Sequence, residues 1–131
     1  MQQAVVVTEH TPEKLKLHWL IMTILKLKIA SIELDQLVNF LIEEITFMYE
    51  NHCVNMSVLM YEDFNYRNMS TQLDMIILKK EEKHILIDII AGAGRTGFFL
   101  TDAGSEEKYT NKVDKILARY AEEHQFELEH L

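Results

Sequence analysis

Residues 71–91 read TQLDMIILKKEEKHILIDIIA, and this stretch decides the fold. Two apolar runs, Leu73–Leu78 and Ile85–Ile90, flank the charged segment Lys79–Lys83. Runs of aliphatic residues on either side of a short polar segment are typical of a β-hairpin. Because nearly every position in both runs is apolar, we expect both faces of this hairpin to be buried.

Further strands are predicted on both sides of the hairpin. Leu25, Leu27 and Ile29 alternate with lysines, a period of two that favours a strand with one buried face. A helix that continues through Ala30 is the alternative for this segment. The predicted strands are Val5–Val7, a segment near residues 23–30, Val54–Asp63, Thr71–Lys80, His84–Ala91 and Thr96–Thr101.

Helices are predicted near the middle and at the end of the chain. Apolar residues recur at offsets of 3, 4, 7, 11, 14 and 15 across residues 33–51, which predicts one helix there. Ser105 can cap a last helix that runs to about His124, with two acids in its first turn. Thr11–Glu13 is also a good helix start, because a hydroxyl cap precedes proline and an acid.

These elements predict a single α+β domain over residues 1–131. We expect two layers: an antiparallel sheet of about four to five strands, with a long helix near the middle of the chain and a C-terminal helix packed on it. A chain of 131 residues can bury about two thirds of its unfolded surface. Since two helices do not cover both apolar faces, we expect the N-terminal helix or a second subunit to cover the other.

The charge balance and the cysteine count narrow the function classes. Thirteen basic against 21 acidic residues give a net charge of −8, which disfavours nucleic acid and anionic membranes as partners. A single cysteine cannot form an intramolecular disulfide. The longest uncharged apolar run, Trp19–Leu25, is 7 residues, too short to span a membrane, and no signal peptide is evident. We expect a cytoplasmic protein.

The glycines after the predicted strand His84–Ala91 suggest a ligand-binding interpretation. Gly92, Gly94 and Gly97 form G-x-G-x-x-G, the spacing of a dinucleotide-binding loop. That loop should open a helix and be followed by a second strand with an acidic residue. Here strand-like residues and Gly104 follow instead, and no second strand remains. A strand that leads into a glycine-rich turn or bulge is the favoured interpretation.

A second known motif matches the sequence of this segment more closely. Ala91–Gly97 resembles the phosphate loop of protein tyrosine phosphatases, H-C-x-A-G-x-G-R-[ST]-G. In that family a low-pKa cysteine attacks phosphorus. The cysteine position here is Ile89, and Cys53 lies 36 positions upstream of it, so phosphatase activity is not expected. Phosphate or small-ligand binding by Arg95, Thr96 and the backbone amides of the loop is the alternative that remains.

The segment Val58–Val113 is similar to a family of small uncharacterised bacterial α+β proteins, mainly Gram-positive. The similarity rests on a Y/F-x-Y element (Tyr61–Tyr66), the charged hairpin, the glycine-rich turn, a Phe-Phe strand and G-x-E-E at Gly104–Glu107. The resemblance implies the α+β fold and a structural role for the glycines. It implies no activity.

Two acids interrupt the apolar strands of the hairpin. If the hairpin is centred on Glu82, Asp88 faces Ile76 and Asp74 faces Ile90, so both carboxylates lie on one sheet face. Paired carboxylates suit acid–base chemistry or metal binding. A register shifted by one residue would put them on opposite faces. The interpretation that we favour is that each acid hydrogen-bonds or pairs locally with Arg67, a lysine or Arg95.

The remaining motifs indicate no catalytic residue, metal site or cofactor. The six histidines lack metal-ligand spacing, and G-x-S-x-G is absent. Excess apolar faces, an acidic composition and seven methionines favour a non-enzymatic, homodimeric protein-interaction or regulatory module. The alternative is a small-ligand or phosphate-binding protein that uses the Gly92–Gly97 loop.

Overall fold

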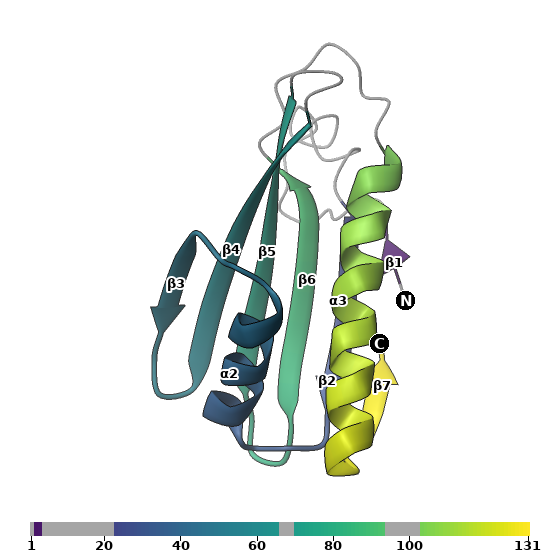
Figure 1. Ribbon diagram of the computed structural model, residues 1–131. Coiled ribbons are helices and arrows are strands. Elements are labelled where there is room, and N and C mark those ends of the chain that lie inside the picture. Colours follow the sequence, from purple (N-terminus) through teal and green to yellow (C-terminus); the bar gives the residue numbers. More distant parts are fainter. Residues whose placement is uncertain (1, 4–22, 66–69, 94–102) are drawn as a thin grey trace, which may run out of the picture.

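In the computed structural model the chain forms an antiparallel sheet with two helices packed on one face (Figure 1). The structure describes residues 2–3, 23–65, 70–93 and 103–131. Within these residues the sheet has seven strands. They are β1 (Gln2–Gln3), β2 (Thr23–Ile29), β3 (Tyr49–His52), β4 (Met56–Asn65), β5 (Ser70–Lys80), β6 (Ile85–Ala93) and β7 (Leu128–His130).

The strand order is β1-β2-β6-β5-β4-β3, and β7 pairs with β2 beside β1. Every described pair is antiparallel. The β5–β6 hairpin predicted from the sequence therefore lies at the centre of the sheet. The α+β class is confirmed, but the sheet has more strands than the four to five expected, because the short strands β1, β3 and β7 extend its edges.

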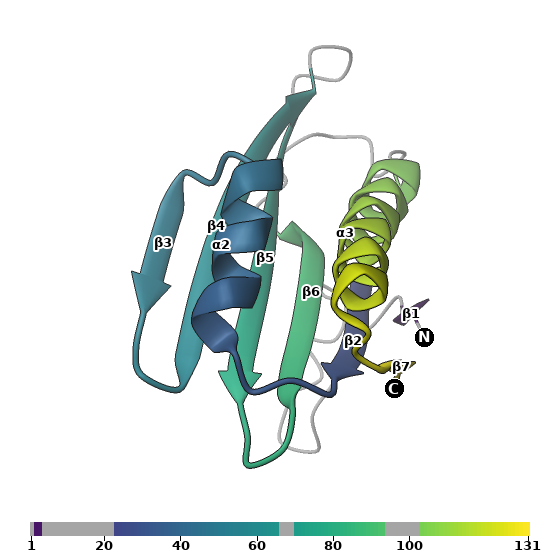
Figure 2. The ribbon, with the colours of Figure 1, turned by 60° about the horizontal axis from the view of Figure 1, so that its bottom comes forward.

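Both described helices lie on the same face of the sheet, as the rotated view in Figure 2 shows. They are α2 (Leu34–Glu44) and α3 (Ala103–His124). The buried residues of α2 follow the helical period predicted from the sequence. No described helix has the combined length and apolar character that crossing a membrane would require.

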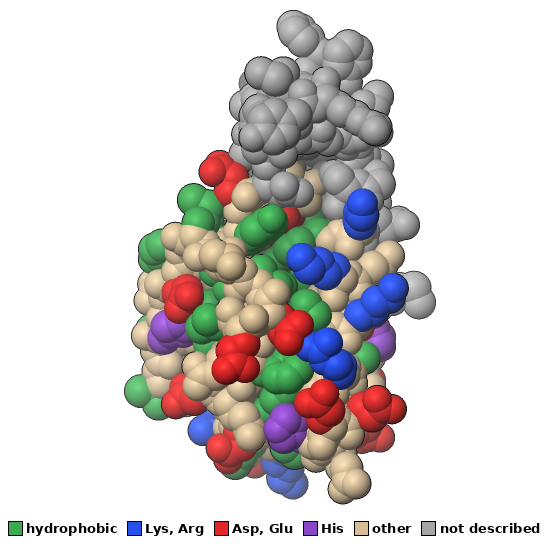
Figure 3. Space-filling model, in the orientation of Figure 1, with side chains coloured by type: hydrophobic (Ala, Val, Ile, Leu, Met, Phe, Trp, Pro, Cys, Tyr) green, Lys and Arg blue, Asp and Glu red, His purple; other side chains and the backbone are tan. Residues whose placement is uncertain are grey.

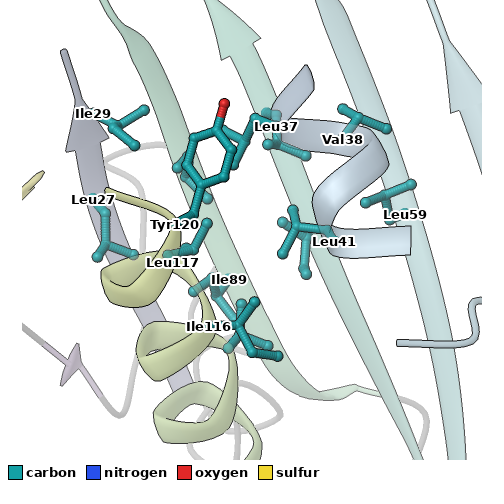
Figure 4. Packing of buried hydrophobic residues seen from close by; sticks show 14 of the residues in the cluster. Leu27, Ile29, Leu37, Val38, Leu41, Leu59, Ile89, Ile116, Leu117 and Tyr120 are labelled. Carbon is teal, nitrogen blue, oxygen red and sulfur yellow. The ribbon is translucent and has the colours of Figure 1, made fainter. Parts of the chain in front are cut away.

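The core lies between this helix pair and the sheet. In β2, Leu25, Leu27 and Ile29 are buried under the helices, as the alternation with lysines predicts. Figure 4 shows Leu117 and Tyr120 of α3 facing the same core as α2. Buried aliphatic side chains of this kind each contribute about 1.5–3 kcal/mol to folding relative to exposure.

The middle helix is shorter than predicted. The sequence favoured a helix over residues 33–51, whereas α2 ends at Glu44 and Ile45 is already extended, with φ −134° and ψ 134°. The segment Ile45–Phe47 contains β-branched and aromatic residues, which favour extended backbone. The apolar side chains that continued the helical period belong to this connection and to β3.

Other predicted elements are shifted or lie outside the described residues. The strand predicted at Val54–Asp63 is β4, two residues later, and the last helix begins at Ala103, two residues before the predicted cap. The predicted strands Val5–Val7 and Thr96–Thr101, the helix start Thr11–Glu13 and its cover of the sheet lie outside the described residues.

The hairpin register differs by one residue from the one expected. Asp88 pairs with Ile77, not with Ile76. The N–H of Glu81 donates to the carbonyl of His84 at 2.7 Å, so the turn contains two residues and its centre lies between positions 82 and 83. Because side chains alternate between faces, this single step separates the two acids of the hairpin.

A left-handed residue ends α3 and returns the chain to β2. Gln125 has φ 59°, the N–H of Phe126 donates to the carbonyl of Ala121 at 2.8 Å, and that of Gln125 to Glu122 at 3.3 Å. This is the hydrogen-bond pattern of a Schellman motif. It directs the following strand, β7, onto the outer edge of β2.

Candidate functional site

The glycine-rich segment begins in a β-bulge of β6. Asp74 pairs with Ala91, but the adjacent Leu73 pairs with Ala93, so Gly92 is the extra residue. Gly92 has φ 110°, a conformation that glycine adopts without steric cost. An extra residue with positive φ is typical of a bulge. Of the predicted glycine-rich turn or bulge, the structure shows the bulge at Gly92. The short strand predicted after it lies outside the described residues.

The rest of the candidate phosphate loop lies outside the described residues. This holds for Gly94, Arg95, Thr96 and Gly97. Ligand binding by these residues stays a prediction. The structure does define the surroundings of Gly92, from which the loop departs.

A buried polar cluster, made of Tyr61, Gln72, Asp74 and Tyr109, lies beside the bulge. Asp74 is completely buried, and its Oδ1 accepts a hydrogen bond of 2.6 Å from Nε2 of Gln72. Tyr61 pairs with Asp74 across β4 and β5, and its ring stacks on Tyr109 of α3 with centroids 6.0 Å apart. Buried polar groups cost free energy unless they are paired, so the hydrogen bond from Gln72 stabilises the buried Asp74. Among the described residues the buried hydroxyl of Tyr109 has no hydrogen-bond partner.

The surroundings of Tyr109 raise the pKa of its phenol. Burial is the largest cause, followed by the negative charge of Asp74 and then by Tyr61. The phenol therefore stays protonated throughout the physiological pH range. A protonated phenol beside a carboxylate offers one donor and several acceptors to neighbouring groups.

The charge of this cluster disfavours phosphate at the start of the loop. Asp74 pairs with Ala91, the residue directly before Gly92. An anion held by the backbone amide of Gly92 would lie close to this buried carboxylate. Like charges repel more strongly where water is excluded. The geometry thus favours a structural role for the bulge.

Asp88 lies on the sheet face opposite Asp74. Its Oδ1 is 3.5 Å from Nζ of Lys26, and both side chains are partly exposed. The paired-carboxylate hypothesis is therefore wrong. Asp88 pairs with a lysine, as favoured, whereas Asp74 is bonded to the amide of Gln72. Arg67 and Arg95 lie outside the described residues. Within the described ranges, no three His, Cys, Asp or Glu side chains are grouped so that they could hold a metal ion.

The sheet face that points away from α2 and α3, here called the open face, is also rich in apolar residues. Its side chains are partly exposed. They are Val58 and Met60 of β4, Leu73, Met75 and Ile77 of β5, and Leu86 and Ile90 of β6. No described helix covers this face (Figures 1 and 2).

Strand register orders the open face into rows. Tyr49, Met60, Met75 and Ile90 are cross-strand partners from β3 to β6, so one apolar row crosses four strands. In β2 the row continues with Ile24, which pairs with Ile90 and is buried. Beside it the face is polar, because Lys26 is paired with Asp88. The opposite face has charged side chains over its helices, with basic ones gathered along α3 (Figure 3).

Sequence reasoning missed the edge strand β3. All four of its residues are exposed, so it shows no apolar alternation. The signal that could have found it is the turn Val54–Asn55, since Asn is favoured in two-residue hairpin turns. The N–H of Cys53 donates to the carbonyl of Met56 at 2.7 Å and closes that turn.

The comparisons with known proteins do not extend these observations. The resemblance of Val58–Val113 to small bacterial α+β proteins stays a prediction. No family model, curated protein or solved structure matches this chain.

Proposed function

We propose that this protein is a non-enzymatic protein-interaction module, dimeric in solution, whose open face binds an apolar surface of a protein partner. The observation that carries the proposal is the apolar row of Tyr49, Met60, Met75 and Ile90. Contiguous apolar surface of this kind marks protein–protein contacts. Burying it against a partner would lower the free energy by roughly 25 cal/mol per Å².

The composition of the row supports protein binding. Met60 and Met75 pair directly across β4 and β5, at the centre of the open face. Unbranched methionine side chains adapt to partners of different shape. Small-ligand or phosphate binding through the Gly92–Gly97 loop is the weaker proposal, because the carboxylate of Asp74 lies beside its start.

A photoreactive amino acid at Met75 tests the proposal in the cells that make the protein. We expect cross-links to a partner polypeptide from position 75, and none from the same group at the exposed Glu122 on α3. The captured partner, once purified, should lose about tenfold or more in affinity for Met75→Lys, a change of about 1.4 kcal/mol. Glu122→Lys should keep the affinity.

Either of two results would overturn the proposal. Cross-links from position 75 that reach only residues 4–22 of the same chain would mean that the chain covers its own open face. Equal affinity of the partner for Met75→Lys and for the unmodified protein would mean that binding uses another surface.

A further inference from the structure

The strand β3 forms one end of the sheet and, among the described residues, pairs only with β4. Figure 1 shows it at the left margin, and all four of its residues are exposed. An edge strand leaves a row of backbone N–H and C=O groups available for another strand. Apolar side chains lie just beyond both its ends, with Met48 60% and Val54 87% exposed.

Hydrogen-bond alternation decides which backbone groups of this strand point outward. The N–H of Cys53 donates to the carbonyl of Met56, so the backbone of Cys53 faces β4. Groups alternate between the two sides of an antiparallel strand, so those of Asn51 also face β4. The N–H and C=O groups of Glu50 and His52 therefore point to the free edge.

We propose that β3 pairs antiparallel with β3 of a second copy of this chain, with Asn51 at the two-fold axis. The inference rests on the dimer of the proposed function and names its strand and register. In a symmetric pair, outward-facing groups must meet outward-facing groups. The two-fold axis therefore passes through a residue and not between two residues. An axis at Tyr49 would pair Glu50 with Met48, whose N–H already donates to the carbonyl of Met60 at 2.9 Å. Within β3 this leaves axes at Glu50, Asn51 or His52.

Charge selects one of these three registers. An axis at Glu50 would place two Glu50 carboxylates opposite each other, and an axis at His52 would pair the two His52 rings. An axis at Asn51 places Glu50 opposite His52 of the second copy, twice. Opposite charges or hydrogen-bond partners directly across two strands stabilise the pair, whereas like charges destabilise it.

The side chains of Glu50 and His52 contact each other within one chain. His52 Nε2 lies 3.1 Å from Oε1 of Glu50, and His52 Nδ1 lies 2.9 Å from Oγ of Ser57. The contact with Ser57 fixes the orientation of the imidazole ring. Across the axis, two such pairs would form one cluster of alternating acid and imidazole on the same side of the sheet.

The register centred on Asn51 also matches the apolar ends of the strand. It places Tyr49, at one end of β3, opposite Cys53, which follows the other end, in the second copy. Each of these apolar side chains would lose water-exposed area. A strand complementary to itself in a single antiparallel register identifies a second copy as its partner.

The pairing has a consequence for the open face. Side chains of directly paired residues lie on the same side of a sheet, and Asn51 pairs with Val58 of the open face. Both open faces would therefore lie on the same side of one continuous sheet. The dimer would present them to a partner as a single surface.

A cysteine placed on the axis tests the register. In a Cys53→Ser background, Asn51→Cys should form a disulfide-linked dimer under mild oxidation. Paired residues of this kind have Cα atoms about 4.5 Å apart, within disulfide range. Glu50→Cys in the same background is the control, because its counterpart would lie about 8 Å away. Equal or faster cross-linking of Glu50→Cys overturns the register.

Charge exchange tests the pairing itself. Glu50→Lys should raise the dimer dissociation constant about tenfold, because an ammonium group then faces His52, and adding His52→Glu should restore it. Native mass spectrometry at several concentrations measures both constants. An unmodified chain that stays monomeric, or a dimer unaffected by Glu50→Lys, overturns the pairing. Photo-cross-linking at Met75 decides the open face separately, so the two proposals fail distinguishably.

Discussion

The two faces of the sheet are both apolar, yet only one is covered by described helices. The adjacent residues Ile76 and Ile77 of β5 show the difference. Ile76 points to the helices and is completely buried, whereas Ile77 points to the open face and is partly exposed. The apolar sequence of β5 thus predicts burial of both strand faces. The position of the helices shows which face is buried within the described chain.

The acids of the hairpin repeat this contrast. Asp74, on the helix face, is buried and bound to Gln72, whereas Asp88, on the open face, forms a partly exposed ion pair with Lys26. A buried carboxylate depends on its hydrogen bonds, because no water replaces them. The same residue type therefore has different importance for stability on the two faces.

The largest effect is expected from alanine at the two neighbouring isoleucines. Ile76→Ala should lower the free energy of unfolding by about 3–4 kcal/mol, because it leaves a cavity in the core. Ile77→Ala should cost only about 1 kcal/mol, since part of its area is already in water. Urea denaturation measures both values. Equal losses would show that the open face is as deeply buried as the helix face.

The carboxylates sharpen the comparison with a smaller effect. Asp74→Ala should destabilise the protein by about 2 kcal/mol, because it leaves the amide of Gln72 buried without this acceptor. Asp88→Ala should stay within about 0.5 kcal/mol, the usual range of an exposed ion pair. Thermal or urea unfolding of the two variants decides, and a larger loss at Asp88 would reverse the assignment of the faces.

Replacing the glycine of the bulge at the end of the hairpin should destabilise the protein about as much as Asp74→Ala. Gly92→Ala should cost about 1–2 kcal/mol, because a Cβ atom disfavours its positive φ. Ala93→Gly, one residue further, is a control that keeps the glycine of the bulge. If Gly92→Ala were neutral in urea denaturation, the positive φ would not be needed for the fold.

A pH profile tests the cluster under the helix face. The pKa of Tyr109 is raised in the folded chain, so the unfolded chain releases this proton first, near pH 10. Stability is therefore kept below pH 10 and falls above it, by about 1.4 kcal/mol per pH unit from this residue. Tyr109→Phe should reduce the slope. An unchanged slope in urea titrations above pH 10 would contradict burial of this phenol.

Patterns with a strong period were predictable from the sequence. The central hairpin follows from its two apolar runs, and β2 from the alternation of Leu25, Leu27 and Ile29. The glycine bulge at Gly92 was also foreseeable, since glycine inside a strand pattern suggests one. In each case local chemistry and tertiary packing favour the same structure.

The missed features depend on geometry that composition does not show. Residues 45–49 continue a helical period, but their backbone preference is extended, so the helix was predicted too long. The register depended on whether the turn contains an even or odd number of residues, and Asp74 and Asp88 changed faces with it. Polar cluster residues such as Gln72 come together only through the register and α3.

The first and last described strands lie beside the same strand of the sheet. Both β1 and β7 pair with β2, and Figures 1 and 2 show the marked ends of the chain side by side. The first and last strands of the described chain are thus neighbours of the same strand. A short linker could join the two ends, and a new start could be opened in the turn at Glu82–Lys83. Such a circular permutant would keep every strand pair while changing which one forms first during synthesis.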